Sequence, residues 1–112
     1  MTNTAVQRND GELERMRAVA ASGDDPPVLM LNLNRYAKAA DYPHGELYLA
    51  YMRALEALLP RVGAKILWRT PVFGQIVGEQ PLDEVLAVWY PSHEAFLGMP
   101  SVEGAKIGRA HV

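Results

Sequence analysis

A β-strand is indicated by the sequence VLMLNLN at positions 28–34. Its first four residues are all apolar, which is typical of a strand that is covered on both faces. Because side chains alternate along a strand, the three leucines share one face, and Val28 and Met30 share the other with the two asparagines. The strand therefore becomes polar at its carboxyl end on one face only.

The residues before this strand predict a break and a short helix. Two aspartates and two prolines at 24–27 interrupt regular structure, because proline lacks an N–H donor and restricts the residue before it. Upstream, residues 10–23 predict a helix with Asp10 as its N-cap and Gly23 as its terminator. Its narrow apolar stripe indicates an arm that packs on the body or on a partner. We therefore divide the chain into a polar segment with a helix at 1–23 and an α+β domain at 24–112.

A long amphipathic helix follows, from about residue 44 to Val62. Apolar residues recur there at three- and four-residue spacing. Pro60 removes one helical hydrogen bond, so we expect the last turn to tighten, and Gly63 is a natural terminator. The stripe that we expect to face the core consists of Tyr48, Tyr51, Met52, Leu55, Leu59 and Val62.

The rest of the chain predicts three strands and a second helix. Alternation predicts a strand at 64–69 with Ile66 and Trp68 on one face, a short strand with glycines at 72–78, and a strand at 84–90. Ser92 is then expected to cap a helix that Pro100 ends, with further helical turns between residues 101 and 110.

This order of elements predicts an α+β sandwich with an antiparallel sheet and helices on one face. The uncovered face would be apolar, with Val28, Met30, Leu67 or Trp68, and Val88 or Trp89. Because soluble proteins rarely expose such a patch, we expect a second copy of the sheet to cover it about a two-fold axis.

Composition limits the classes of function. The 112 residues correspond to one domain, and a net charge of −2 argues against a surface for nucleic acid or an anionic membrane. The chain has no cysteine, which excludes disulfides and thiolate chemistry, and no apolar run approaches the ~20 residues that span a bilayer. Residues 1–9 lack the apolar core of a signal peptide, so we expect a cytoplasmic protein.

Four short motifs resemble the domain-of-unknown-function family 1330. They are the strand at 27–36, a Tyr-x-x-Tyr helix at 45–52, the Val-Gly-Ala-Lys turn at 62–67 and the strand-Pro-Ser-x-Glu-Ala-Phe turn at 89–99. The resemblance implies a ferredoxin-like fold in the dimeric α+β barrel superfamily, which includes cofactor-free monooxygenases and isomerases. Two departures stand out: Asn34 replaces a frequent leucine, and the sequence stops at Val112, where the family continues into a last strand.

Polar residues near the end of the first strand are the candidate ligand-binding groups. A buried amide must be paired, so Asn32 is expected either to bind a ligand or to tie down the strand end. Arg35 suits a carboxylate or a surface ion pair, and His44 suits a general base or a solvated loop. The full set is Asn32, Asn34, Arg35, His44, Tyr48 and Trp68, and we also considered Tyr36, Tyr51, Arg69, Gln75 and His93.

Two functions compete on these residues. The first is a homodimer that binds a small organic molecule between sheet and helices, with Trp68 as a wall, and that is an isomerase or a cofactor-free monooxygenase if it is an enzyme. The second is a binding or assembly module whose interior is packed shut. We expect no metal and no cofactor, because the three histidines do not form a ligand pair. Haem binding through His44 or His93, as in some dimeric barrels, is a third hypothesis.

Overall fold

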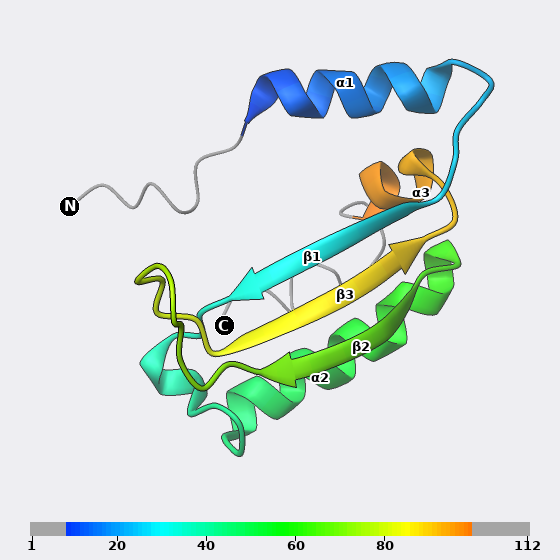
Figure 1. The fold of residues 1–112 in the computed structure, drawn as a ribbon. Coiled ribbons are helices and arrows are strands. Elements are labelled where there is room, and N and C mark those ends of the chain that lie inside the picture. The colour runs from blue at the N-terminus through cyan, green and yellow to red at the C-terminus, as the bar shows by residue number, and fades with distance from the viewer. Residues whose placement is uncertain (1–8, 100–112) are drawn as a thin grey trace.

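The fold was analysed in a computed structural model that describes residues 9–99 (Figure 1). It is a small α+β structure in which helices lie beside a three-stranded antiparallel sheet. The elements are α1 (Asp10–Ala21), β1 (Val28–Asn34), the 3-10 turn η2 (Lys38–Ala40), α2 (Glu46–Leu58), the 3-10 turn η3 (Leu59–Val62), β2 (Lys65–Pro71), β3 (Glu84–Tyr90) and α3 (His93–Gly98).

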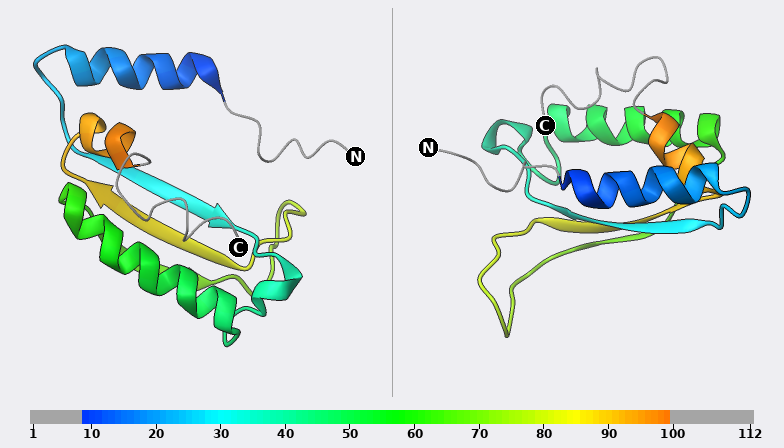
Figure 2. Two further views of the ribbon diagram at one scale, coloured as in Figure 1. Left: turned by 180° about the vertical axis from the view of Figure 1, so that it is seen from behind. Right: turned by 90° about the horizontal axis from the view of Figure 1, so that it is seen from above.

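The strand order is β1-β3-β2, so the last of the described strands lies at the centre of the sheet. β1 pairs with β3 from Val28 opposite Tyr90 to Asn34 opposite Glu84. Helix α2 connects the two outer strands and covers one face of the sheet, as Figure 2 shows from above. The predicted bounds of the first and last strands, 28–34 and 84–90, are confirmed.

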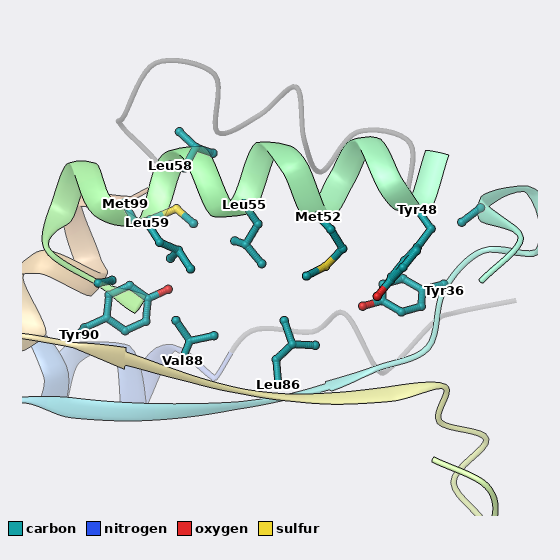
Figure 3. Packing of buried hydrophobic residues seen from close by; sticks show 12 residues of the cluster. Tyr36, Tyr48, Met52, Leu55, Leu58, Leu59, Leu86, Val88, Tyr90 and Met99 are labelled. Atoms are coloured by element: carbon teal, nitrogen blue, oxygen red, sulfur yellow. The ribbon is translucent and has the colours of Figure 1, made fainter. Parts of the chain in front are cut away.

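The core lies between α2 and the face of β3 that carries Leu86, Val88 and Tyr90 (Figure 3). Leu86 and Val88 are completely buried, and Met52 and Leu55 of α2 pack against the same cluster. Burial of each such side chain stabilises the fold by about 1.5–3 kcal/mol. The predicted core stripe of α2 is confirmed, although Tyr51 and Val62 are only partly buried.

Helix ends follow the local sequence closely. The chain tightens at Pro60 into the 3-10 turn η3, and Gly63 then adopts a left-handed conformation with φ 75°. Gly23 likewise takes φ 83° after α1. The predicted N-cap Asp10 is wrong: Asn9 caps α1, and its side-chain oxygen accepts from the Glu12 N–H at 3.2 Å. Asn9 has the extended conformation that a capping side chain needs, whereas Asp10 is already helical.

A β-bulge between Ile66 and Trp68 corrects two predictions about faces. Ile66 lies opposite Val88 and faces the helix, whereas Trp68 lies opposite Ala87 and faces away, because the extra residue reverses the alternation. Val28 and Met30 were also assigned to the uncovered face, but they pack against the core. We call the uncovered side the open face; by register it carries Leu29, Leu31, Leu33, Val85, Ala87, Trp89, Lys65, Trp68 and Thr70.

The predicted strand at 72–78 is wrong. Residues 72–83 instead form a long connection between β2 and β3, and we call it the β2–β3 arm. Gly74 and Gly78 have φ of 157° and 93°, values that break an extended pairing at both ends of this stretch. The Ser92 cap is confirmed, since its hydroxyl accepts from the Ala95 N–H at 3.0 Å. The helical turns predicted between 101 and 110 lie outside the described residues.

Candidate functional site

A buried carboxylate lies where β3 begins. The pleat of β3 directs Glu84 to the same side as Leu86, toward α2, and the residue is 3% exposed. Tyr36, from the connection after β1, donates its hydroxyl to Glu84 Oε1 at 2.6 Å. The hydroxyl of Tyr48, in the first turn of α2, lies 3.0 Å from both carboxylate oxygens. Three segments distant in sequence therefore meet at one acidic group.

The carboxylate is stabilised by neutral donors. Within residues 9–99, no basic side chain forms an ion pair with Glu84. A hydroxyl carries one proton, so Tyr48 shares a single proton between the two oxygens, and Oε2 keeps a lone pair with no other donor among the described residues. Burying a carboxylate without a counter-ion is costly unless hydrogen bonds satisfy its oxygens.

A second layer of contacts fixes the cluster. Asn34 Nδ2 donates to the Tyr36 hydroxyl at 3.0 Å, and the Tyr36 N–H donates to Asp83 Oδ2 at 2.8 Å. The ring of Tyr42 stacks on Tyr36 with centroids 5.3 Å apart and meets Tyr48 edge-on at 4.8 Å. We call Asn34, Tyr36, Tyr48 and Glu84 the Tyr–Glu cluster.

The tyrosines of this cluster are donors. Burial raises the pKa of Tyr36 well above its ordinary value, and the hydrogen bond to Glu84 raises it further. The pKa of Tyr48 is raised by the same two causes. Both hydroxyls therefore keep their protons at neutral pH, so neither tyrosine acts as a base there.

The structure separates the predicted site residues into two groups. Asn32, Asn34 and Tyr48 lie on the helix-facing side, close to Glu84. Asn32 is partly buried opposite Leu86, and its amide makes no hydrogen bond within residues 9–99. Arg35 and His44 are exposed to solvent beside this region.

Trp68 lies apart from the Tyr–Glu cluster. It lines an open groove of about 380 Å³ along β2. The other lining residues are Glu56, Leu59, Pro60, Ala64, Lys65, Ile66 and Arg69. Arg69 and Glu56 approach each other to 4.0 Å across this groove. Trp68 therefore lines a groove whose lining includes neither Asn32 nor Asn34.

Sequence reasoning missed Glu84 and Asp83, the acidic pair at the start of β3. A signal was present, because Glu84 lies at an alternate position with Leu86, Val88 and Tyr90 in an otherwise apolar strand. Alternate residues share one face of a strand, so this spacing places an acidic side chain on the face that must be buried.

His93 is mostly buried. Its side chain is 16% exposed, and its Nδ1 lies 2.8 Å from Asp25 Oδ1. Burial opposes ionisation of Asp25, but the N–H groups of Glu94 and His93 hold its pKa below the usual value. This pair anchors the segment before β1 to the start of α3. Asp25 and His93 are 68 positions apart, so the contact left no local signal in the sequence.

Two absences apply to the part of the chain that the structure describes. There, no three histidine, cysteine or acidic side chains are grouped as a metal site requires. No helix between residues 9 and 99 has the length and apolar character needed to cross a membrane.

Two solved structures resemble this fold, and both come from proteins titled RPA0582. The crystal structure of the methylated RPA0582 protein has a TM-score of 0.73 and 28% sequence identity, and the match covers 96% of this chain and 83% of that one. The second structure is RPA0582 from Rhodopseudomonas palustris, titled a protein of unknown function. It has a TM-score of 0.69 and 28% sequence identity, and the match covers 92% of this chain and 82% of that one. No model of a known protein family matches the sequence, and no curated protein matches it significantly.

Proposed function

We propose that this protein binds a small polar organic molecule beside the Tyr–Glu cluster and that it acts as a homodimer. The observation that supports binding is Glu84, an acidic group that is 3% exposed and has only hydroxyl partners within residues 9–99. A carboxylate kept at this energetic cost suits recognition of a ligand that donates a hydrogen bond or carries a positive charge.

The neighbouring asparagines define the chemistry of the ligand further. The Asn32 amide offers a donor and an acceptor that no described side chain uses. Asn32 lies on β1 directly opposite Leu86 of β3, on the same face of the sheet as Glu84. A molecule with a hydroxyl or amine toward Glu84 Oε2 and a carbonyl toward Asn32 satisfies both groups. Tyr42 and the aliphatic side chain of Met30 supply apolar surface nearby.

If the ligand is transformed, Glu84 is the group that exchanges the proton. The raised pKa values of Tyr36 and Tyr48 keep both tyrosines protonated, so they orient the carboxylate and do not replace it. This arrangement favours proton transfer, as in an isomerisation, over chemistry that begins with a tyrosinate.

The fold supports the proposed dimer. The order β1-β3-β2 with α2 crossing between the outer strands is the first half of a ferredoxin-like arrangement. Leu29, Leu31 and Leu33 on the open face are each about half exposed, at 49%, 56% and 54%. Pairing of two open faces buries these leucines and produces the α+β barrel that we expected from the resemblance to family 1330.

Native mass spectrometry tests both parts of the proposal. We expect a dimer that carries a co-purified small organic mass, and we expect Asn32→Leu to lose that mass while remaining dimeric. Leu47→Ser, an exposed change on α2, is the matched control and should keep the ligand. An empty wild-type dimer after gentle purification, together with no response to a library of small polar compounds in thermal shift, contradicts the ligand proposal.

A second function, the packed assembly module, is favoured by one observation. The interior between α2 and β3 is tightly filled, since Leu59, Leu86 and Val88 are almost completely buried and no buried polar side chain within residues 9–99 lacks a partner. An empty dimer in the experiment above, with no ligand response, supports this alternative.

A further inference from the structure

The β2–β3 arm presents large apolar side chains to solvent. Phe73 is 95% exposed, Ile76 104% and Val77 90%, so the arm buries almost none of their surface within its own chain. Such side chains are rarely grouped on the surface of a monomer unless the group contacts a partner. We therefore expect an apolar surface of another molecule to cover these side chains.

The base of the arm is fixed to the sheet, and its direction is defined. The Val72 N–H donates to the Asp83 carbonyl at 2.9 Å, which extends the β2–β3 pairing by one step. The Asp83 N–H donates to the Asn34 carbonyl at 2.8 Å, so the base is also joined to β1. Figure 2 shows the arm extending to the side of the sheet opposite α2, which is the side of the open face.

The open face alone is small for a stable interface. By register the open face carries nine side chains, whereas a stable interface usually takes about 20–30 residues from each partner. The arm is the other exposed apolar surface on this side, and its dozen residues, running out and back, reach about 18 Å. Sheets pack ~10 Å apart, so an arm of this length passes the partner's sheet.

Two open faces can pair about a two-fold axis that runs either parallel to the strands or across them, and the charge of the arm favours the second arrangement. The arm contains Glu79 and Asp83 and no basic residue. A two-fold axis parallel to the strands brings the two acidic arms together, which is unfavourable. An axis across the strands instead brings each arm to the far end of the partner's open face, where Lys65, Trp89 and Leu29 form one row.

We propose that the β2–β3 arm of each copy clasps the second copy at this far row, with Phe73, Ile76 and Val77 on Leu29 and Trp89, and Glu79 near Lys65. This inference rests on the proposed homodimer and specifies how its two sheets are oriented. The arm and the open face then cover each other in a closed, symmetric dimer.

Sedimentation equilibrium of three proteins tests the clasp. The variant Phe73→Ser/Ile76→Ser/Val77→Ser should weaken dimerisation at least tenfold. The control Leu47→Ser/Leu49→Ser changes apolar residues of similar type on α2, which are 37% and 38% exposed, and should leave the dimer constant unchanged. Circular dichroism checks that both variants stay folded. A monomeric wild type overturns the homodimer itself, whereas an arm variant that dimerises as tightly as wild type overturns the clasp alone.

Cross-linking tests the orientation independently of stability. Because the chain has no cysteine, Glu79→Cys and Lys65→Cys each introduce a single thiol. After the two variants are mixed and exchange subunits, a short bis-maleimide should join them into a covalent dimer, and neither variant alone should cross-link. A covalent dimer from Glu79→Cys alone would place the two arms together and overturn the proposed orientation.

Discussion

The Tyr36 hydroxyl donates to Glu84 Oε1 across 2.6 Å and joins two residues that are 48 positions apart. The same hydroxyl accepts from Asn34 Nδ2 at 3.0 Å, so it uses both its donor and an acceptor position. Since Tyr48 supplies the other proton to Glu84, the start of the central strand, the end of β1 and the first part of α2 are held by one short network. The stability of the fold and the proposed binding site therefore depend on the same atoms.

Tyr36→Phe should lower the free energy of unfolding by about 1–3 kcal/mol, because it leaves a buried carboxylate oxygen with one donor fewer. Tyr42→Phe is the matched control: its ring also stacks in the cluster, but its hydroxyl makes no hydrogen bond within residues 9–99, so we expect a change of less than ~0.5 kcal/mol. Urea unfolding at one fixed protein concentration measures both, since association would alter the apparent stability. Equal losses in the two variants would contradict the role given to the Tyr36 hydroxyl.

Stability should fall at alkaline pH in a way that depends on two tyrosines. Burial and the bond to Glu84 raise the pKa values of Tyr36 and Tyr48 above the ordinary 10.0. Above pH 10 the unfolded chain releases these protons while the folded chain keeps them, so the folded state binds more protons and loses stability as the pH rises. The limiting slope is about 1.4 kcal/mol per pH unit for each tyrosine that stays protonated.

Urea unfolding between pH 9 and 11.5 measures this slope. The double variant Tyr36→Phe/Tyr48→Phe should show a shallower decline than wild type over that range. Absorbance at 295 nm offers a second readout, since both tyrosines should ionise only as the protein unfolds. Wild type and double variant declining in parallel would be the result that excludes this linkage.

The sequence predicted those features that depend on local chemistry. The alternation in β1, the apolar stripe of α2, the tightened turn at Pro60 and the left-handed Gly63 all follow from residues within one or two turns of each other. The resemblance to family 1330 added a ferredoxin-like dimer, of which the described residues contain the three-stranded α+β part.

Features set by tertiary contacts were not predictable in this way. The bulge at Leu67 adds one residue to β2 and moves Trp68 to the open face, yet alternation in the sequence continues through it. Residues 73–78 have strand propensity, but in the described structure they have no neighbouring strand to pair with. Glu84 meets Tyr36 and Tyr48 only after the sheet has formed, so Asn34 and Tyr48 were identified as candidates without their shared acidic partner.

The two asparagines of β1 should respond differently to the same substitution. Asn32→Leu should leave stability unchanged or raise it, because the Asn32 amide has no hydrogen-bond partner within residues 9–99 and a leucine adds apolar contact. Asn34→Leu should lower the free energy of unfolding by about 1–3 kcal/mol, because it removes the donor to the Tyr36 hydroxyl.

Thermal denaturation of both variants separates structure from binding. If Asn32 serves a ligand, ligand-free Asn32→Leu keeps the thermal midpoint of ligand-free wild type, and the variant loses the co-purified mass in native mass spectrometry. A loss of stability as large as that of Asn34→Leu would instead make Asn32 a structural group and would remove it from the proposed site.

Gly45 is required where the chain enters α2, and its replacement should be costly. It caps the helix with φ −69°, so its backbone conformation is ordinary, but it lies close against the preceding turn. A Cβ placed there meets the Ala40 carbonyl oxygen and lies 2.6 Å from Asp41 Cβ, and the Gly45 N–H donates to the Asp41 carbonyl at 2.6 Å. Backbone atoms cannot rotate away as a side chain can, so Gly45→Ala must displace η2 from α2. We expect the free energy of unfolding, measured in urea, to fall by at least ~2 kcal/mol.

Gly98→Ala is the control, because a Cβ at that helical position meets no atom within 4 Å, and it should be neutral or stabilising by up to about 1 kcal/mol. A Gly45→Ala protein as stable as wild type would mean that the turn before α2 adapts freely, and the position of Tyr48 against Glu84 would then not depend on this close approach.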